Sequence, residues 1–150
     1  MKEFKIKSSL FSSMQLFDEN GELVGELFFN LISGFKEKIK INQDVFKIKN
    51  VHFLGTDIEI VDQNDKLLIE SDILQSILIY YGSSKEIYTY ENAGWFNNKM
   101  SVFRKSELVI TINKKGIFKT QYEIKVADGF KNYLVILTFL NFYIRILSND

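Results

Sequence analysis

Two neighbouring segments of the chain alternate lysine with apolar residues. Residues 35–41 read Phe-Lys-Glu-Lys-Ile-Lys-Ile, and residues 46–53 read Phe-Lys-Ile-Lys-Asn-Val-His-Phe. Alternation with a period of two is typical of a strand that has one apolar and one polar face. We therefore predict two paired strands, Phe35–Ile41 and Phe46–Phe53. Their outer face would carry five lysines: Lys36, Lys38, Lys40, Lys47 and Lys49.

Pairing of these strands would place lysines directly opposite one another. If all five share one face, the connecting loop holds an even number of residues, and a loop of two or four is expected. The predicted pairs are Ile41 with Phe46, Lys40 with Lys47, and Lys38 with Lys49. Like charges directly opposite destabilise a sheet by up to about 1 kcal/mol, and an anionic partner would relieve that cost. The pattern predicts a phosphate or headgroup site; the alternative is a solvated row of lysines that splay apart.

An aromatic segment offers a second candidate surface. The sequence Asn92-Ala-Gly-Trp-Phe96 follows a stretch that contains Tyr88 and Tyr90. Tryptophan favours the membrane interface, so a loop that presents Trp95 and Phe96 would suit a membrane contact. Tryptophan after a glycine turn can also fold back and cap the end of a barrel. Both interpretations stay open from the sequence.

The composition argues against several classes of function. The chain has no cysteine and a single histidine, His52, so neither a metal site nor a cofactor is expected. Its formal net charge is +0, whereas a dedicated nucleic-acid binder usually carries a basic excess. No nucleophile elbow, HExxH motif or phosphate-binding glycine loop is found, so no enzyme is expected. The first residues do not resemble a signal peptide, which favours the cytoplasm.

The last apolar segment, Tyr133–Leu147, predicts a helix that is apolar around most of its circumference. Such a helix must be buried on nearly every side. It spans roughly 22 Å, whereas the hydrocarbon core of a bilayer is about 30 Å thick. A buried helix is therefore favoured over a membrane span. Thr138, Asn141 and Arg145 share one helical face, which suits a helix inside a barrel with this polar stripe at a seam or open end.

The elements before this helix are predicted to be short strands and tight turns. Asp128 is the expected N-cap, which would place the helix at about residues 129–147. Hairpin turns are expected at residues 18–21, 62–65 and 113–116, where Asp, Asn or Gly occurs. The first two belong to a repeated unit, since Leu16–Glu26 aligns with Ile60–Glu70 at a spacing of 44 residues.

Alternation along the chain predicts about twelve strands. The expected strands are Glu3–Lys7, Leu10–Phe17, Glu22–Ile32, Phe35–Ile41, Phe46–Phe53, Asp57–Val61, Lys66–Ser71, Leu74–Tyr81, Glu86–Glu91, Lys99–Arg104, Glu107–Ile112 and Ile117–Val126. Ser71 or Asp72 could instead cap a short helix. With 150 residues, 46% hydrophobic and 15% aromatic, the chain has the size and composition of one domain with a substantial core.

These features together resemble the tubby C-terminal-like superfamily, which includes phospholipid scramblases and LURP-one-related proteins and has small bacterial members. The resemblance rests on three segments: Phe17–Val24, Val61–Leu68 and the predicted helix Tyr133–Leu147. The resemblance implies a mainly β fold, a closed barrel of about twelve strands around a hydrophobic C-terminal helix. It also implies a binding module, with anionic phospholipid at a membrane surface as the expected partner. A protein–protein interaction module, such as a bacterial regulator or toxin-neutralising partner, is the alternative.

Overall fold

The computed structural model describes residues 1–8, 13–29, 37–51, 57–93, 98–114 and 122–148. These residues form twelve strands and one helix. They are β1 (Lys2–Ser8), β2 (Ser13–Phe17), β3 (Leu23–Phe28), β4 (Lys38–Ile41), β5 (Asp44–Asn50), β6 (Ile58–Val61), β7 (Leu67–Asp72), β8 (Ile77–Tyr81), β9 (Lys85–Ala93), β10 (Lys99–Arg104), β11 (Glu107–Lys114), β12 (Tyr122–Val126) and α1 (Tyr133–Ser148).

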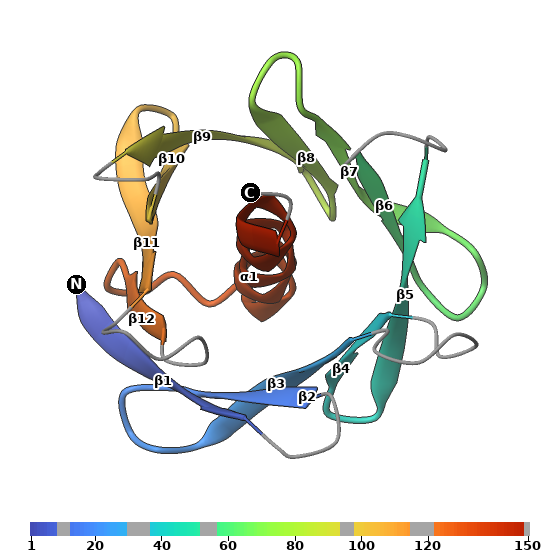
Figure 1. Cartoon of the computed structure of the whole chain (residues 1–150). Helices are drawn as coiled ribbons and strands as arrows, with labels where there is room; N and C mark the ends of the chain where they lie inside the picture. The colour runs from blue at the N-terminus through green and yellow to red at the C-terminus, as the bar shows by residue number, and fades with distance from the viewer. Residues whose placement is uncertain (9–12, 30–36, 52–56, 94–97, 115–121, 149–150) are drawn as a thin grey trace.

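The strands close into an antiparallel barrel in which each strand pairs with its neighbours in sequence. Closure is made by β1 and β12, where Phe4 lies opposite Ile124. Figure 1 shows the strands as a ring with α1 running through its middle. The predicted fold class, a mainly β closed barrel around a C-terminal helix, is confirmed.

The barrel has two distinct ends. Neighbouring strands are antiparallel, so all odd-numbered strands run toward the same end. We call this end the C-terminal rim, because α1 also ends there. In its last turn, Arg145 donates a hydrogen bond of 2.6 Å from Nη1 to Asn50 Oδ1, at the end of β5. The opposite rim carries the hairpin turns that join β2 to β3, β4 to β5 and β6 to β7.

The core lies between the inner face of the barrel and α1. Alternate strand residues and most of the helix are at most 1% exposed, including Leu16, Leu27, Ile39, Ile60, Ile69, Met100, Ile112, Val135, Ile136, Leu137, Phe139 and Leu140. Two tyrosines of β9 add edge-to-face contacts: Tyr88 lies 6.2 Å from Phe139, and Tyr90 lies 5.1 Å from Phe142 between ring centroids. A helix that is apolar on nearly all sides is thereby removed from water.

The two copies of the repeated hairpin have the same turn. Asp18 Oδ1 accepts hydrogen bonds of 2.9 and 3.0 Å from the backbone N–H groups of Asn20 and Glu22. Asp62 Oδ1 accepts bonds of 2.8 and 2.9 Å from the equivalent groups in the second copy. Both copies also shift register at equivalent positions, between Leu16 and Phe17 and between Ile60 and Val61. The turn and bulge are therefore encoded locally by the shared sequence.

Two of the predicted turn and strand boundaries are wrong. Residues 113–116 were expected as a tight turn, but Asn113 and Lys114 belong to β11, and Lys114 pairs with Tyr122. The predicted strand Leu74–Tyr81 begins at Ile77, and residues 73–76 form a turn. The Asp72 carboxylate caps that turn by accepting bonds from the N–H groups of Leu74 and Gln75, so it stabilises a turn and not a helix.

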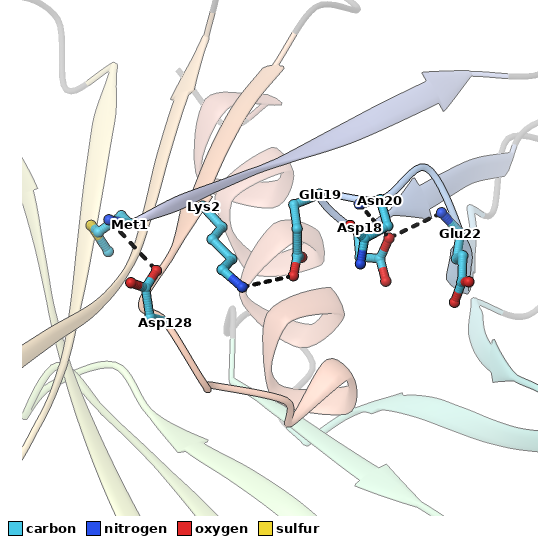
Figure 2. A network of polar contacts seen from close by, with 7 residues as sticks. All are labelled: Met1, Lys2, Asp18, Glu19, Asn20, Glu22 and Asp128. Carbon is cyan, nitrogen blue, oxygen red and sulfur yellow. Dashed lines mark hydrogen bonds and ion pairs between the residues drawn. The ribbon is translucent and has the colours of Figure 1, made fainter.

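The predicted helix start is also wrong. The helix begins at Tyr133, and Asn132 is its N-cap, because Asn132 Oδ1 accepts a 3.2 Å bond from the backbone N–H of Val135. Asp128 lies five residues before the helix, in a turn whose Gly129 has a φ of 80°. Figure 2 shows the Asp128 carboxylate beside the amino group of Met1, at 3.9 Å, and Lys2 beside Glu19, at 3.1 Å.

The polar stripe of α1 lies against the β4–β5 side of the barrel. The Thr138 hydroxyl donates a 2.7 Å hydrogen bond to the carbonyl of Leu134, one turn earlier in the helix, as buried threonines in helices often do. Arg145 donates from Nε to Asn141 Oδ1 at 2.9 Å and pairs with the Glu37 carboxylate. The stripe therefore ends at the C-terminal rim, an open end of the barrel, which is one of the two positions expected for it. Among the described residues, no helix combines the length and apolarity that crossing a bilayer requires.

One glycine marks where α1 comes closest to the wall. The helix backbone approaches β3 and β4 more closely than the other strands. A Cβ added at Gly25 of β3 would lie 2.5 Å from Leu137 Cδ1 and 3.3 Å from the Lys40 carbonyl oxygen. The missing side chain therefore makes room for a fully buried leucine of the helix.

Replacing the observed cap tests the corrected helix start. We expect Asn132→Ala to lower the free energy of unfolding by about 1 kcal/mol, because the Val135 N–H loses its partner. The matched control is Asp128→Ala, which removes only an exposed ion pair and should change stability by less than about 0.5 kcal/mol. Urea denaturation followed by circular dichroism measures both. A larger effect at Asp128 than at Asn132 would contradict the assignment.

Filling the space at Gly25 tests the close approach of α1. Gly25→Ala should destabilise the protein by about 1–3 kcal/mol, because a buried side chain must move out of its preferred position. Leu137→Ala alone should also destabilise it, through a cavity. The double variant should lose less than the sum of the two single losses, since each change relieves the other. Additive losses in a denaturation cycle would argue against contact between the two sites.

Candidate functional site

The β4–β5 hairpin presents lysines on the outside of the barrel, in a register that differs from the predicted one. The turn consists of Asn42 and Gln43, so its length of two residues is one of the two expected. The predicted opposition of Ile41 and Phe46 is wrong, because Ile41 lies opposite Asp44. The observed pairs are Lys38 with Lys47, Ile39 with Phe46, Lys40 with Val45, and Ile41 with Asp44. The predicted pairs of Lys40 with Lys47 and Lys38 with Lys49 are therefore wrong by two residues.

The four described lysines of the hairpin share one exposed face. Ile39 and Ile48 are 0% and 8% exposed and point into the core, so the alternating residues point outward. We call the outward set Lys38, Lys40, Lys47 and Lys49 the lysine face. The observed register retains one directly opposed pair of like charges, Lys38 and Lys47.

Carboxylates outside the hairpin offset part of this charge: Glu59 of β6 lies directly opposite Lys49, and an aspartate of a neighbouring turn reaches ion-pair distance. Asp65, in the β6–β7 turn, places Oδ1 3.8 Å from Lys47 Nζ and 3.7 Å from Lys49 Nζ. All three side chains are about half exposed or more, so each pair contributes only a few tenths of a kcal/mol. The sequence reasoning missed this role of Asp65. It identified Asp62–Asp65 as a turn, but the turn's proximity to β5 follows from the pairing of β5 with β6.

The β4 lysines have a different environment. Lys38 Nζ lies 5.1 Å from the centre of the Phe28 ring, over a partly buried aromatic side chain of β3. Lys40 lies opposite Val45 on one side and Glu26 on the other. Within the described part of the chain, neither lysine has a carboxylate at ion-pair distance. Because Glu26 lies directly opposite Lys40, Lys38 carries the least compensated charge of the lysine face.

The other candidate residues cannot be placed on this face. Lys36, Trp95, Phe96 and His52 lie outside the described residues, so their predicted roles stay predictions. The two tyrosines that precede Trp95 point inward, since Tyr88 is 0% and Tyr90 is 6% exposed. These tyrosines serve the core and do not belong to an outer aromatic surface.

A shallow concavity lies on the other side of the barrel. Its volume is about 780 Å³, and it lies between the start of β9 and the β10–β11 turn. The lining residues include Lys85, Glu86, Ile87, Arg104 and Lys105. Glu86 is already engaged, because its carboxylate accepts from the Tyr88 hydroxyl and lies 3.7 Å from Arg104 Nη1. The concavity thus offers mixed charge and no converging acid–base pair.

We searched the residues that the structure describes for clusters of side chains that could bind a metal ion and for groups with perturbed pKa values. No group of three or more His, Cys, Asp or Glu side chains there could hold a metal ion. Core tyrosines are among the perturbed groups: burial, with Asp57 and Asp72 adding to it, raises the pKa of Tyr90 to about 12. Burial likewise raises the pKa of Tyr143 to about 12. These two shifts follow mainly from burial around α1.

Comparisons with known proteins add little to this geometry. No protein-family model matches the chain, and no curated protein matches it. Among solved structures, an X-ray structure of a protein from Arabidopsis thaliana is similar, with a TM-score of 0.41 and 12% sequence identity. The similarity covers 98% of this chain and 91% of that chain. A likeness this low transfers neither a family nor a function to the present chain.

Tyr90 and Tyr143, both buried, should respond differently to loss of the hydroxyl. Tyr143 donates a 2.6 Å bond to the Asn98 carbonyl, so Tyr143→Phe should destabilise the protein by about 1 kcal/mol. The Tyr90 hydroxyl has no partner within the described part of the chain, so Tyr90→Phe should be neutral or stabilising at pH 7. Urea denaturation at pH 7 measures both, and a loss above 1 kcal/mol for Tyr90→Phe would contradict this.

Alkaline pH supplies a second measurement of the same variants. Because its pKa is raised in the fold, each neutral tyrosine contributes stability that is fully present below about pH 10 and is lost as pH rises toward 12. Tyr90→Phe should therefore make the fall of stability between pH 10 and 12 shallower than in the unmodified protein. An unchanged slope would show that Tyr90 does not titrate in this range.

Proposed function

We propose that this chain is a non-enzymatic binding module of the tubby-like kind, which contacts anionic phospholipid headgroups through its lysine face. A closed twelve-stranded barrel with a hydrophobic C-terminal helix in its interior supports the tubby-like assignment. In this proposal the protein is cytoplasmic and peripheral to the inner face of the membrane.

The observation that carries the proposal is the direct opposition of Lys38 and Lys47 on an exposed face. Such a pair costs stability in a sheet, and the Asp65 carboxylate offsets charge only on the β5 side. Phosphate groups spaced along a membrane surface would neutralise the charge that remains at Lys38. A flexible lysine suits this role, since an ammonium accepts many headgroup geometries.

The expected strength of this contact is modest. A lysine near an anionic leaflet contributes about 1 kcal/mol, and screening reduces this as ionic strength rises. Four lysines, partly offset by Asp65, Glu26 and Glu59, would therefore give no more than about 4 kcal/mol, which corresponds to a Kd near 1 mM. The lysine face alone thus predicts weak, reversible and salt-sensitive association with anionic lipid.

Vesicle sedimentation with charge variants tests the proposal. The unmodified protein should bind phosphatidylserine-containing vesicles at low salt and should not bind phosphatidylcholine vesicles. Lys38→Glu combined with Lys47→Glu should weaken binding at least about tenfold, because two attractions become repulsions. Asp65→Asn should strengthen binding about two- to threefold, since it releases Lys47 and Lys49.

A matched control separates a specific face from general charge. Lys85→Glu combined with Lys105→Glu makes the same change in net charge at two exposed lysines of the distant concavity. This control should bind vesicles nearly as the unmodified protein does. Equal losses in both double variants, or no binding of the unmodified protein, would rule out the lysine face as a lipid site.

A protein–protein interaction module is the second candidate, and the concavity beside β9 favours it. Two apolar side chains on this side of the barrel are unusually open to solvent: Ile87 is 48% exposed and Leu108 is 39% exposed. Exposed apolar groups beside mixed charges are typical of a protein contact. If no vesicle composition binds, pull-down with Ile87→Asp as the negative control would test this candidate.

A further inference from the structure

The outer side of β8, β9 and β10 carries a continuous, largely apolar surface. Ile79 of β8 lies directly opposite Ile87 of β9, and Thr89 lies between Ile77 of β8 and Phe103 of β10. Ile87 is 48% exposed, and the other apolar side chains of this set are partly exposed. We call these five residues the β9 face. Neighbouring apolar side chains on the outside of a barrel are typical of a contact with another protein.

The alternation of the three strands produces this face. Leu78, Tyr88 and Val102 are at most 1% exposed and point into the core, so the residues beside them in each strand point outward. On β12 the outward positions are charged instead, at Glu123 and Lys125. The apolar outward residues of the β9 face are therefore not required by the barrel fold.

The two ends of the β9 face carry opposite charge. Lys85 and Glu91 are the outward, exposed residues of β9 on either side of the face. Lys105, in the β10–β11 turn, lies at the same end as Lys85, since both line the concavity. In the residues that the structure describes, none of these three has an oppositely charged group at ion-pair distance. The face is thus basic at one end and acidic at the other.

Other charged groups nearby leave this pattern unchanged. Glu86 lies 3.7 Å from Arg104 Nη1, so this pair is neutral as a whole. Lys99 lies opposite Ala93, beyond Glu91 and outside the face. The remaining charges lie two strands from β9, where the convex wall of the barrel curves away. They are Glu107 on β11, and Glu70 and Asp72 on β7.

We propose that two copies of this chain associate through the β9 face about a two-fold axis, with their β9 strands antiparallel. Such an axis exchanges the two ends of β9, so Lys85 of each copy meets Glu91 of the other. Positions 85 and 91 are equally far from Tyr88, so Ile87 then meets Thr89, and Ile77 meets Ile79. Parallel β9 strands would instead bring Lys85 against its own copy, a repulsive contact.

This inference deepens the second candidate function, because it names the partner as a second copy of the chain. It does not depend on the lysine face. Three strands, β6, β7 and β8, lie between β5 and β9, and Figure 1 shows β4 and β5 across the ring from β9 and β10. Both lysine faces therefore stay open in the dimer, on its two outer sides.

The backbone of the β10–β11 turn gives a second reason to assign a contact to Lys105. Lys105 and Ser106 have φ values of 50° and 66°, in the left-handed region. Asparagine and glycine adopt this conformation in two-residue hairpin turns with less strain. A lysine here thus costs stability in the monomer, and its ammonium adds to the positive charge that meets Glu91 of the second copy.

The size of the face indicates a weak dimer. Three strands, with β9 counted from residue 85 to 91, cover a surface about 20 Å long and roughly 15 Å wide. A standard interface buries about 800 Å² on each side, so this contact belongs to the small, transient class. The formal net charge is +0, so long-range repulsion does not oppose association. We expect a Kd on the order of 10–100 µM.

Sedimentation velocity with two charge reversals tests the proposal. The unmodified protein should shift from monomer toward dimer between about 5 and 500 µM. Lys85→Glu alone and Glu91→Lys alone should each weaken self-association at least about tenfold, because both contacts across the axis become repulsive. An equimolar mixture of the two variants should dimerise again, since every contact between unlike copies is then attractive. Circular dichroism checks that each variant folds.

The strained turn supplies a test with a matched control. Lys105→Asn should raise the urea midpoint of the fold and yet weaken self-association about threefold, because it relieves strain and removes a charge. Ser106→Gly relieves strain without a change of charge, so it should raise the midpoint and leave self-association unchanged. Among apolar changes, Ile87→Asp should prevent dimerisation, whereas Leu23→Asp, at a 53% exposed position on β3, should not.

The outcomes that overturn the inference are distinct from those that overturn the proposed functions. A chain that stays monomeric to about 500 µM, or a mixture of the two charge variants that fails to dimerise, rules out this dimer. If the chain is monomeric but captures a different protein in a manner that Ile87→Asp abolishes, the dimer fails and the second candidate function stands. Vesicle binding tests the lysine face separately, since Lys85→Glu should leave it unchanged.

Discussion

The structure depends on burial of one apolar helix inside a ring of strands. A barrel of twelve strands encloses more space than its own inward side chains would fill, and α1 occupies that space. The helix in turn has too little polar surface to be stable when exposed to water. Each part therefore removes the other's apolar surface from solvent, and the strand alternation, Gly25 and the edge-to-face tyrosine contacts all serve this single packing arrangement.

Because α1 occupies the interior, the surfaces that remain open to solvent are the outside of the barrel and its rims. A ligand-carrying barrel needs an open interior, whereas here the helix residues Val135 to Leu140 are fully buried against the wall. Charged side chains accordingly lie on outward strand positions, where Lys38 opposes Lys47, or at the rim, where Arg145 pairs with Glu37. The same packing explains the raised pKa values of the inward tyrosines, whose largest cause is burial.

The sequence predicts those features that follow from local periodicity. The helix near Tyr133–Leu147, the two Asp-capped hairpins and the outward lysines of β4 and β5 follow from such patterns. The predicted register of β4 and β5 is wrong, because a period of two determines which face a residue occupies but not which partner lies opposite. The predicted N-cap, Asp128, is wrong because Asp128–Gly129 forms a turn of its own before the helix. An Asp before a Gly fits a turn and a cap equally well, so the sequence offers no reason to prefer Asn132. The contacts of Asp65 depend on tertiary pairing, which the sequence does not encode locally.

The repeated hairpin shows how one local unit acquires two roles. Its shared residues build the same turn and the same bulge in both copies, so the difference between the copies lies in what each position contacts. Gly25 in the first copy admits Leu137 of α1, whereas the equivalent Ile69 fills its own space in the core. Gly21 in the first turn is matched by Asp65 in the second, where both residues have a positive φ and the aspartate faces two lysines. The first copy is therefore adapted to hold the helix, and the second adjusts the charge of the outer surface.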